Sequence, residues 1–81
     1  MADIYIQTLL IHRTEHLARR VIEVLNLRNY VPVGVGSNQT GRRWSRIVLM
    51  VDLERGTIED QLYFRYIRTL LIPDGQLLTL T

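Results

Sequence analysis

The chain alternates short apolar runs with two segments of helical periodicity. Residues 3–12 are rich in Ile, Leu, Tyr and Thr with partial period-2 alternation, which predicts a strand. The stretch 44–52, WSRIVLMVD, is the most continuous apolar run and predicts a central strand. Residues 30–37 predict a strand at a sheet edge, because Pro32 lacks a backbone N–H to donate. The segment QLLTLT, residues 76–81, predicts a short last strand.

Two amphipathic helices are predicted between these strands. Thr14 has the side chain of an N-cap, and the apolar residues that follow form a stripe that we expect to face the core: Leu17, Val21, Val24 and Leu25. Thr57 opens the second helix, with Asp60 three residues later in the pattern of a capping box. The core-facing stripe predicted for this helix is Ile58, Leu62, Tyr66 and Leu70. Pro73-Asp74-Gly75 predicts a turn after it.

The order of these elements is β-α-β-β-α-β. This order is typical of an α+β ferredoxin-like sandwich, in which two helices lie on one face of a four-stranded antiparallel sheet. Eighty-one residues are enough for one domain, so we predict a single domain over residues 1–81.

The predicted strands are apolar on both faces. If Ile47, Leu49 and Val51 point toward the helices, the alternating residues leave the other face of the sheet open and apolar. A small chain of this kind gains stability by association, so we expect a homodimer. The predicted partner interface is Tyr5, Val33, Val35, Trp44, Val48 and Met50.

Composition narrows the function classes. The chain has no cysteine, which excludes disulfides and thiolate sites and fits a cytoplasmic location. All ten basic residues are arginine, but eight acids leave a net charge of only +2, so nucleic acid is not the expected partner. No signal peptide or membrane-spanning segment is evident, and we predict no membrane association.

The stretch His12-Arg13-Thr14-Glu15-His16 spells the H-x-x-E-H order of one class of zinc peptidases. That site needs both histidines on one helical face, whereas here the first ends a strand and the second begins a helix. We therefore predict no metal site. The serines have no base beside them in an assignable arrangement, so we predict no catalytic residues, no cofactor and no enzyme activity.

One alternative is an RNA-binding module. IYIQTL, residues 4–9, nearly reproduces the first-strand motif of RNA-recognition modules, which share the β-α-β-β-α-β order. The second motif of such modules needs two aromatic residues on the central strand, and this chain offers Trp44 alone. The surface that this alternative predicts is Tyr5, Arg42, Arg43, Trp44 and Arg46.

A resemblance to a known family rests on residues 8–37, which include Arg20-Val21 and Arg28 followed by Tyr30, and on SRIVLMVD at residues 45–52. These stretches resemble the regulatory small subunit of acetolactate (acetohydroxyacid) synthase, an ACT domain. The resemblance implies a non-catalytic domain that dimerises edge to edge and binds a larger, thiamine-diphosphate-dependent catalytic subunit. It also implies a site for a branched-chain amino acid effector beside the loop after the first strand.

The residues that the resemblance assigns to the effector loop and ligand site are Arg13, Thr14, Glu15, His16, Leu17, Val31, Pro32 and Val33. This chain departs from the family pattern Asn-x-Pro-Gly, because Arg13, Glu15 and His16 stand at its Asn, Pro and Gly positions. Glu15 places a negative charge where an amino acid's carboxylate would lie. We therefore expect no binding of valine, leucine or isoleucine.

The function expected from the sequence is a non-catalytic regulatory or activating subunit of a metabolic enzyme, with acetolactate synthase in branched-chain amino acid biosynthesis as the enzyme that the resemblance implies. Two alternatives remain open. One is the single-strand RNA-binding module, and the other is a free-standing ACT protein that senses an amino acid.

Overall fold

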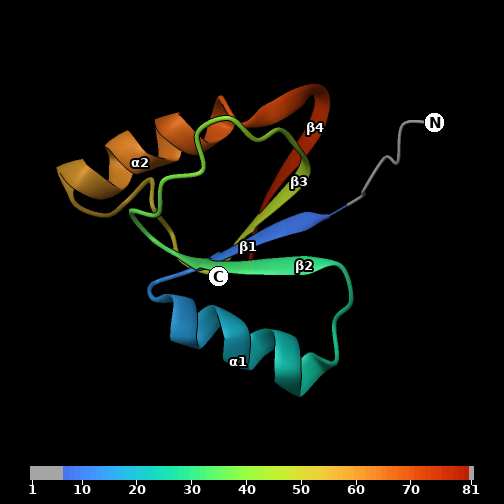
Figure 1. Ribbon diagram of the computed structural model, residues 1–81. Helices are drawn as coiled ribbons and strands as arrows, with labels where there is room; N and C mark the ends of the chain where they lie inside the picture. The colour runs from blue at the N-terminus through green and yellow to red at the C-terminus, as the bar shows by residue number, and fades with distance from the viewer. Residues whose placement is uncertain (1–6, 81) are drawn as a thin grey trace.

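The computed structural model describes residues 7–80, which form four strands and two helices (Figure 1). In chain order these are β1 (Thr8–His12), α1 (Glu15–Leu25), β2 (Tyr30–Gly34), β3 (Trp44–Leu49), α2 (Ile58–Arg68) and β4 (Leu71–Thr79). The predicted order β-α-β-β-α-β is confirmed. The part of the first predicted strand that precedes residue 7 lies outside the described residues.

The strands form one sheet in the order β2-β1-β3-β4, and every neighbouring pair is parallel. The predicted antiparallel ferredoxin-like sheet, and with it the ACT-like architecture, is therefore wrong. The apolar run of β3 is compatible with a parallel sheet, whose strands are commonly apolar on both faces.

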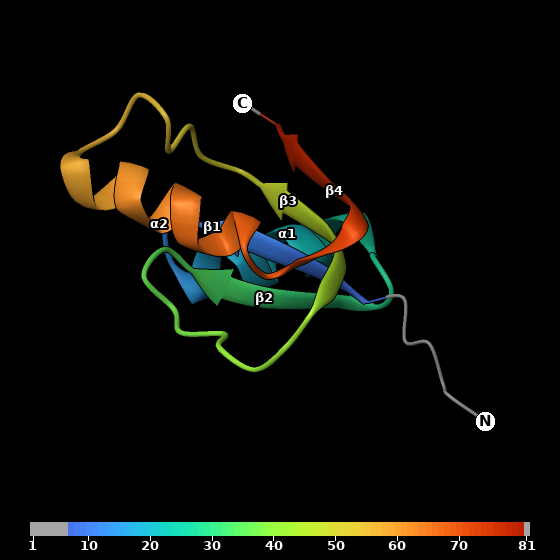
Figure 2. The same cartoon turned by 90° about the horizontal axis from the view of Figure 1, so that it is seen from above.

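The two helices lie on opposite faces of the sheet, α2 on one side and α1 on the other (Figures 1 and 2). The prediction of two helices on one face is also wrong. The chain runs outward from β1 to β2 and, in the opposite direction, outward from β3 to β4. Because parallel crossovers are right-handed, opposite directions place their helices on opposite faces.

Two predictions about strand position are confirmed. β3 lies in the interior of the sheet, between β1 and β4. β2, which contains Pro32, lies at an edge. Pro32 is paired in register with Leu10 of β1, and an edge strand has a free side on which the missing N–H costs no ladder hydrogen bond.

Side-chain hydrogen bonds define the start of both helices, as predicted. The Thr14 side chain accepts a hydrogen bond from the Leu17 N–H at 3.2 Å. Thr57 and Asp60 form a reciprocal capping box at the start of α2. α1 ends at Leu25, and its C-cap residue Asn26 adopts the left-handed conformation with φ of 51°. Asparagine tolerates that conformation better than most residues.

The larger core lies between α2 and the sheet. It contains the buried side chains of Leu9, Ile11, Val33, Trp44, Ile47, Leu49, Leu53, Tyr63, Ile67 and Leu70. The core on the other face is smaller and comprises Leu10, Ala18 and Val48 with partly buried neighbours. The sheet is therefore packed to different extents on its two sides.

Both helices are rotated relative to the predicted core stripes. In α2, Tyr63 and Ile67 are buried, whereas Ile58 and Leu62 are exposed. In α1 the fully buried residue is Ala18, and the predicted core residues Leu17, Val24 and Leu25 are exposed. Only the last predicted residue of the second stripe, Leu70, lies fully in the core.

β3 is irregular at its start. The register with β4 shifts between Trp44, which pairs with Leu71, and Arg46, which pairs with Gln76. Between these pairs β3 advances two residues and β4 five, so the additional residues lie in β4, where Pro73-Asp74-Gly75 had been predicted as a turn. Trp44 lies in the core on the α2 side, while Val48 packs on the α1 side. A regular strand would place both residues on the same face, as the sequence analysis assumed.

Within residues 7–80, neither helix combines the length and the apolar character that spanning a membrane requires.

Candidate functional site

An apolar groove lies on the α1 side of the sheet. α1 contacts β2 and β1, which leaves the same face of β3 and β4 without a helix above it. Two adjoining hollows of about 200 and 350 Å³ occupy this space. Together they define the α1-face groove, lined by Leu10, His12, Leu17, Arg20, Val21, Val24, Leu25, Leu27, Tyr30, Arg46, Val48, Met50, Leu78 and Leu80.

The strands supply the floor of the groove and α1 supplies one wall. Val48 and Leu78 are paired in register on β3 and β4, so their side chains lie side by side on the floor. Leu17, Val21 and Val24 follow one flank of α1 at helical spacing and line the adjoining hollow. The other side of the groove ends at β4, which is an edge strand.

Exposed apolar side chains concentrate in this groove. Eight large apolar side chains are exposed among the described residues, and five of them line it: Leu17, Val24, Leu25, Leu78 and Leu80. Scattered single apolar residues are ordinary on protein surfaces, but a contiguous group marks an interaction site. The cluster also explains the wrong helix prediction, because the apolar stripe of α1 faces the groove instead of the sheet.

The formal charges at the groove are all positive. Arg20 of α1 and Arg46 of β3 line it, and no aspartate or glutamate does so. Neither arginine forms an ion pair within residues 7–80. Their stems extend the apolar surface while the guanidinium groups remain in solvent.

The residues assigned to the effector loop divide into two groups. Arg13, Thr14, Glu15, His16 and Leu17 lie together at the turn from β1 into α1. Glu15 forms an ion pair with Arg19 at 3.1 Å, one turn along the helix. The β2 end of the same chain closes this turn, because a Cβ on Gly34 would lie 2.9 Å from the Glu15 nitrogen. The end of β2 therefore packs closely against the start of α1 within one chain.

Val31, Pro32 and Val33, the other predicted ligand residues, lie in β2. Val33 is buried in the core on the α2 side, and Val31 packs against that core. Val31 and Val33 pair in register with Leu9 and Ile11 of β1, further down the strands than the turn that holds Glu15. The structure therefore separates these valines from most of the predicted loop.

The residues predicted as a partner interface are also divided. Val33, Val35 and Trp44 belong to the core on the α2 side. Val48 and Met50 lie on the α1 side and form part of the groove floor. Tyr5 lies outside the described residues. Two of the six predicted residues thus line the groove.

Arg13 crosses from the β1 end to α2 and pairs with Asp60. Two guanidinium nitrogens lie 3.0 and 3.3 Å from the two carboxylate oxygens. The hydrogen bond from Arg13 lowers the pKa of Asp60, and it outweighs the burial that acts in the opposite direction. The pair ties the loop after β1 to the start of α2, at the carboxyl ends of the strands where parallel sheets often bind ligands.

The histidines of the H-x-x-E-H stretch lie on different elements. His12 ends β1, and its Nδ1 accepts a hydrogen bond from the Arg13 N–H at 2.8 Å. His16 is exposed in the first turn of α1. Residues 7–80 contain no group of three or more histidine, aspartate or glutamate side chains placed to hold a metal ion.

The surface of the RNA-binding alternative is divided as well. Trp44 is only 3% exposed, so its ring faces are covered by the core and are not available for stacking on a base. Arg46 lines the α1-face groove, whereas Arg42 and Arg43 lie beside Trp44 in a separate hollow. The arginines therefore do not form one continuous surface.

The sequence analysis did not identify Leu78 and Leu80 as exposed groove residues. It also placed Val24 and Leu25 in the core, whereas both are exposed at the groove. One signal was present in the sequence. α1 carries six apolar residues in eleven positions, more than one face of a short helix buries against a sheet.

No family model, curated protein or solved structure matches this chain.

Proposed function

We propose that the protein is a non-catalytic subunit that works by protein association, and that the α1-face groove is its docking surface, occupied by a second copy of the chain. The observation that carries the proposal is the concentration of exposed apolar side chains in this groove.

Self-association is favoured because the groove is complementary to itself. Each copy has a bare half-sheet, β3 and β4, beside a helix with an outward apolar flank. If two bare halves stack about a two-fold axis parallel to the strands, each half-sheet covers the other. The same arrangement lays the flank of α1 along the free edge of the partner's β4 and protects that edge from further pairing.

The charges fit the same arrangement. Arg46 lies next to Gln76 in the register of β3 and β4, near one end of the bare half-sheet. Stacking about an axis parallel to the strands brings Arg46 opposite the partner's Gln76, whose amide oxygen accepts a hydrogen bond. The two Arg46 side chains then lie on different strands of the sandwich, which limits their repulsion.

The expected affinity is modest. Complete burial of a leucine or valine side chain contributes about 1.5–3 kcal/mol, and the five residues here are already partly covered. In a two-fold symmetric dimer each of these residues is buried in both copies and contributes twice. The gross gain is therefore on the order of 10 kcal/mol, which is offset by an association cost of about 4–15 kcal/mol. Because the gain and the cost are of similar size, we expect a weak dimer that dissociates on dilution.

The regulatory role implied by the family resemblance is retained only in its general form. That resemblance included an antiparallel ACT architecture, and the parallel sheet removes this support. The proposal therefore names association as the activity and does not name an enzyme partner. A subunit that dimerises through one sheet face keeps the α2 face free to contact another protein.

Sedimentation velocity across the micromolar range tests the proposal, with one matched pair of variants. Val24 in the groove and Ile58 on α2 are 72% and 75% exposed, so a charge at either site disturbs the fold equally little. We expect Val24→Glu to shift the protein to monomer and Ile58→Glu to leave the dimer unchanged. A wild-type protein that sediments as a monomer throughout, or a dimer lost only in Ile58→Glu, would refute the proposal.

A further inference from the structure

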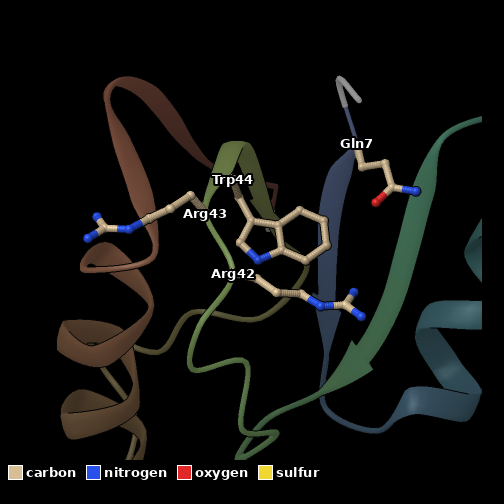
Figure 3. Close-up of a pocket in the computed structure, with 4 residues that line it drawn as sticks. All are labelled: Gln7, Arg42, Arg43 and Trp44. Carbon is tan, nitrogen blue, oxygen red and sulfur yellow. The ribbon is translucent and has the colours of Figure 1, made fainter. Parts of the chain in front are cut away.

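A hollow separate from the α1-face groove, of about 500 Å³, lies at the amino ends of β1 and β3. It is lined by Gln7, Arg42, Arg43 and Trp44 (Figure 3). These residues precede or begin the two central strands, so the hollow is at a sheet end and not on the α1-face groove. It is independent of the surface proposed for dimerisation.

Trp44 contributes an unpaired donor to this hollow. The side chain is 3% exposed, and its Nε1 has no hydrogen-bond acceptor among the described residues. Figure 3 shows the ring nitrogen turned toward the side of the indole where the Arg42 side chain lies. Buried polar groups in native proteins are nearly always paired, so an N–H left in this state indicates that something accepts from it.

The other polar groups around Trp44 are also mainly donors. Arg42 and Arg43 each carry five N–H groups and no acceptor, and Gln7 adds an amide. Arg43 uses one nitrogen on the Thr69 carbonyl oxygen at 3.5 Å, while Arg42 has no ion pair within residues 7–80. No carboxylate lines the hollow. Its chemistry therefore suits a ligand that accepts several hydrogen bonds and carries negative charge.

We infer that this hollow binds a phosphate group, which Arg42 holds by charge-assisted hydrogen bonds and to which the Trp44 Nε1 donates. Figure 3 shows the Arg43 guanidinium pointing the opposite way, toward α2 and β4, so Arg43 contributes positive charge near the site and not a direct hydrogen bond. Phosphate offers the number of acceptor oxygens that these donors require, and the planar guanidinium group matches two of them at once. Arg42 is exposed, so its stem moves off the indole nitrogen without disturbing the core.

A small phosphate compound is favoured over nucleic acid for one reason. Nucleic-acid grooves combine backbone contacts with aromatic faces on which bases stack, and the faces of Trp44 are packed in the core. The indole can therefore contact a ligand only through its N–H group. The protein therefore recognises the ligand by hydrogen bonds to its phosphate oxygens and not by stacking on a base.

The chain has a single tryptophan, so the one indole N–H resonance in a ¹H–¹⁵N spectrum reports directly on this site. We expect inorganic phosphate and then pyrophosphate, titrated at constant ionic strength, to shift that resonance, with the dianionic or more highly charged forms binding more tightly. Arg42→Ala should weaken binding about tenfold, because it removes a charged hydrogen-bonding partner. Arg43→Ala should have a smaller effect, because its guanidinium points toward α2 and supplies only nearby charge.

Arg65→Ala is the matched control, since Arg65 is an exposed arginine of α2 that lines neither this hollow nor the α1-face groove. It should leave the titration unchanged. An indole resonance that stays fixed up to roughly millimolar pyrophosphate would overturn the site. So would a loss of binding in Arg65→Ala as large as that in Arg42→Ala. Tighter binding of a single-stranded oligonucleotide than of pyrophosphate, with the same indole shift, overturns the small-ligand assignment.

Discussion

The two faces of the sheet differ in how completely they are covered. On the α2 side, the helix and the loop that precedes β3 cover the strands, and the Tyr63 hydroxyl donates to the Ser37 carbonyl oxygen of that loop at 2.7 Å. On the α1 side one helix covers β1 and β2 only, and the apolar surface of β3 and β4 is left open. One face therefore stabilises the fold of a single chain, whereas the other is suited to a partner.

The largest expected effect is a difference in folding stability between substitutions on the two faces of the sheet. Ile67 is fully buried on the α2 side, so Ile67→Ala should lower the free energy of unfolding by about 2–5 kcal/mol. Leu80 is exposed at the groove, and Leu80→Ala should cost about 0.5 kcal/mol or less in dilute monomer. Urea denaturation at low protein concentration measures both. Equal losses would show that the groove is part of the monomer's core.

The dependence of the unfolding temperature on protein concentration tests whether the groove face is buried in a dimer. If the groove is buried only in the dimer, the unfolding temperature of the wild-type protein should rise with concentration, since each tenfold increase adds about 1.4 kcal/mol per dimer. Leu80→Asp should abolish this dependence while leaving the dilute protein folded. Scanning calorimetry over two concentrations decides it, and an unfolding temperature that is the same for both proteins at every concentration would argue against a buried groove.

Alkaline pH should affect the α2 side selectively. Burial, with a smaller contribution from Tyr66, raises the pKa of Tyr63 to about 12, above its usual 10.0. The stability linked to the protonated phenol is complete below pH 10 and is lost as the pH rises through 12. Tyr63→Phe should remove this part of the alkaline decline, and Tyr30→Phe on the α1 side should not. Urea titrations at several alkaline pH values test the difference.

Acid pH should reveal the smallest effect, at the Arg13–Asp60 pair. The hydrogen bond from Arg13 lowers the pKa of Asp60 below its usual 3.8. The resulting stability is present above pH 3.8 and is lost as the pH falls through the lower value in the folded state. Asp60→Asn should therefore be less stable than the wild type at neutral pH, and the difference should shrink in acid. If the stability difference between Asp60→Asn and the wild type stays constant from pH 7 into acid, the loss comes from the capping box alone and not from the ion pair with Arg13.

Local signals predicted several elements well. Thr14 and Thr57 begin their helices because a side-chain oxygen at an N-cap pairs with a backbone N–H that has no other partner. Pro32 identified an edge strand, and the apolar run of β3 identified an interior one. Each of these predictions depends only on chemistry within a few residues of the chain.

Strand direction was not predictable in the same way. The order β-α-β-β-α-β fits both an antiparallel sandwich and a parallel sheet, because the segment between β2 and β3 can either form a hairpin or cross the sheet. Here residues 35–43 cross back on the α2 side, and Tyr66 accepts a hydrogen bond from the Gln39 N–H at 2.7 Å. Tertiary contacts such as this one, far apart in sequence, determine the direction of β3.

The candidate site was only partly predictable for a related reason. Val48 and Met50 were placed correctly on an open face, but Trp44 was assigned to the same face by strict alternation. Trp44 instead faces the α2 side, next to the point where the pairing of β3 with β4 changes register. Strict alternation along β3 takes no account of such a change. The helical stripe of α1 was recognised, but periodicity does not distinguish a stripe that meets the sheet from one that faces a partner.

Cross-linking through a single introduced cysteine tests most directly whether the groove is the dimer interface. The chain has no cysteine, so a single introduced cysteine reports on one position only. Leu78 on the groove floor and Leu62 on α2 are 43% and 57% exposed, and each can be replaced by cysteine without opening a core. The proposed two-fold axis places the two Leu78 side chains on diagonal strands of sheets about 10 Å apart, which a linker of that length spans and a disulfide does not. With a bis-maleimide linker of about 10 Å we expect Leu78→Cys to form a cross-linked dimer much faster than Leu62→Cys. Equal rates, or faster linkage through Leu62→Cys, would contradict the assignment of the α1-face groove as the docking surface.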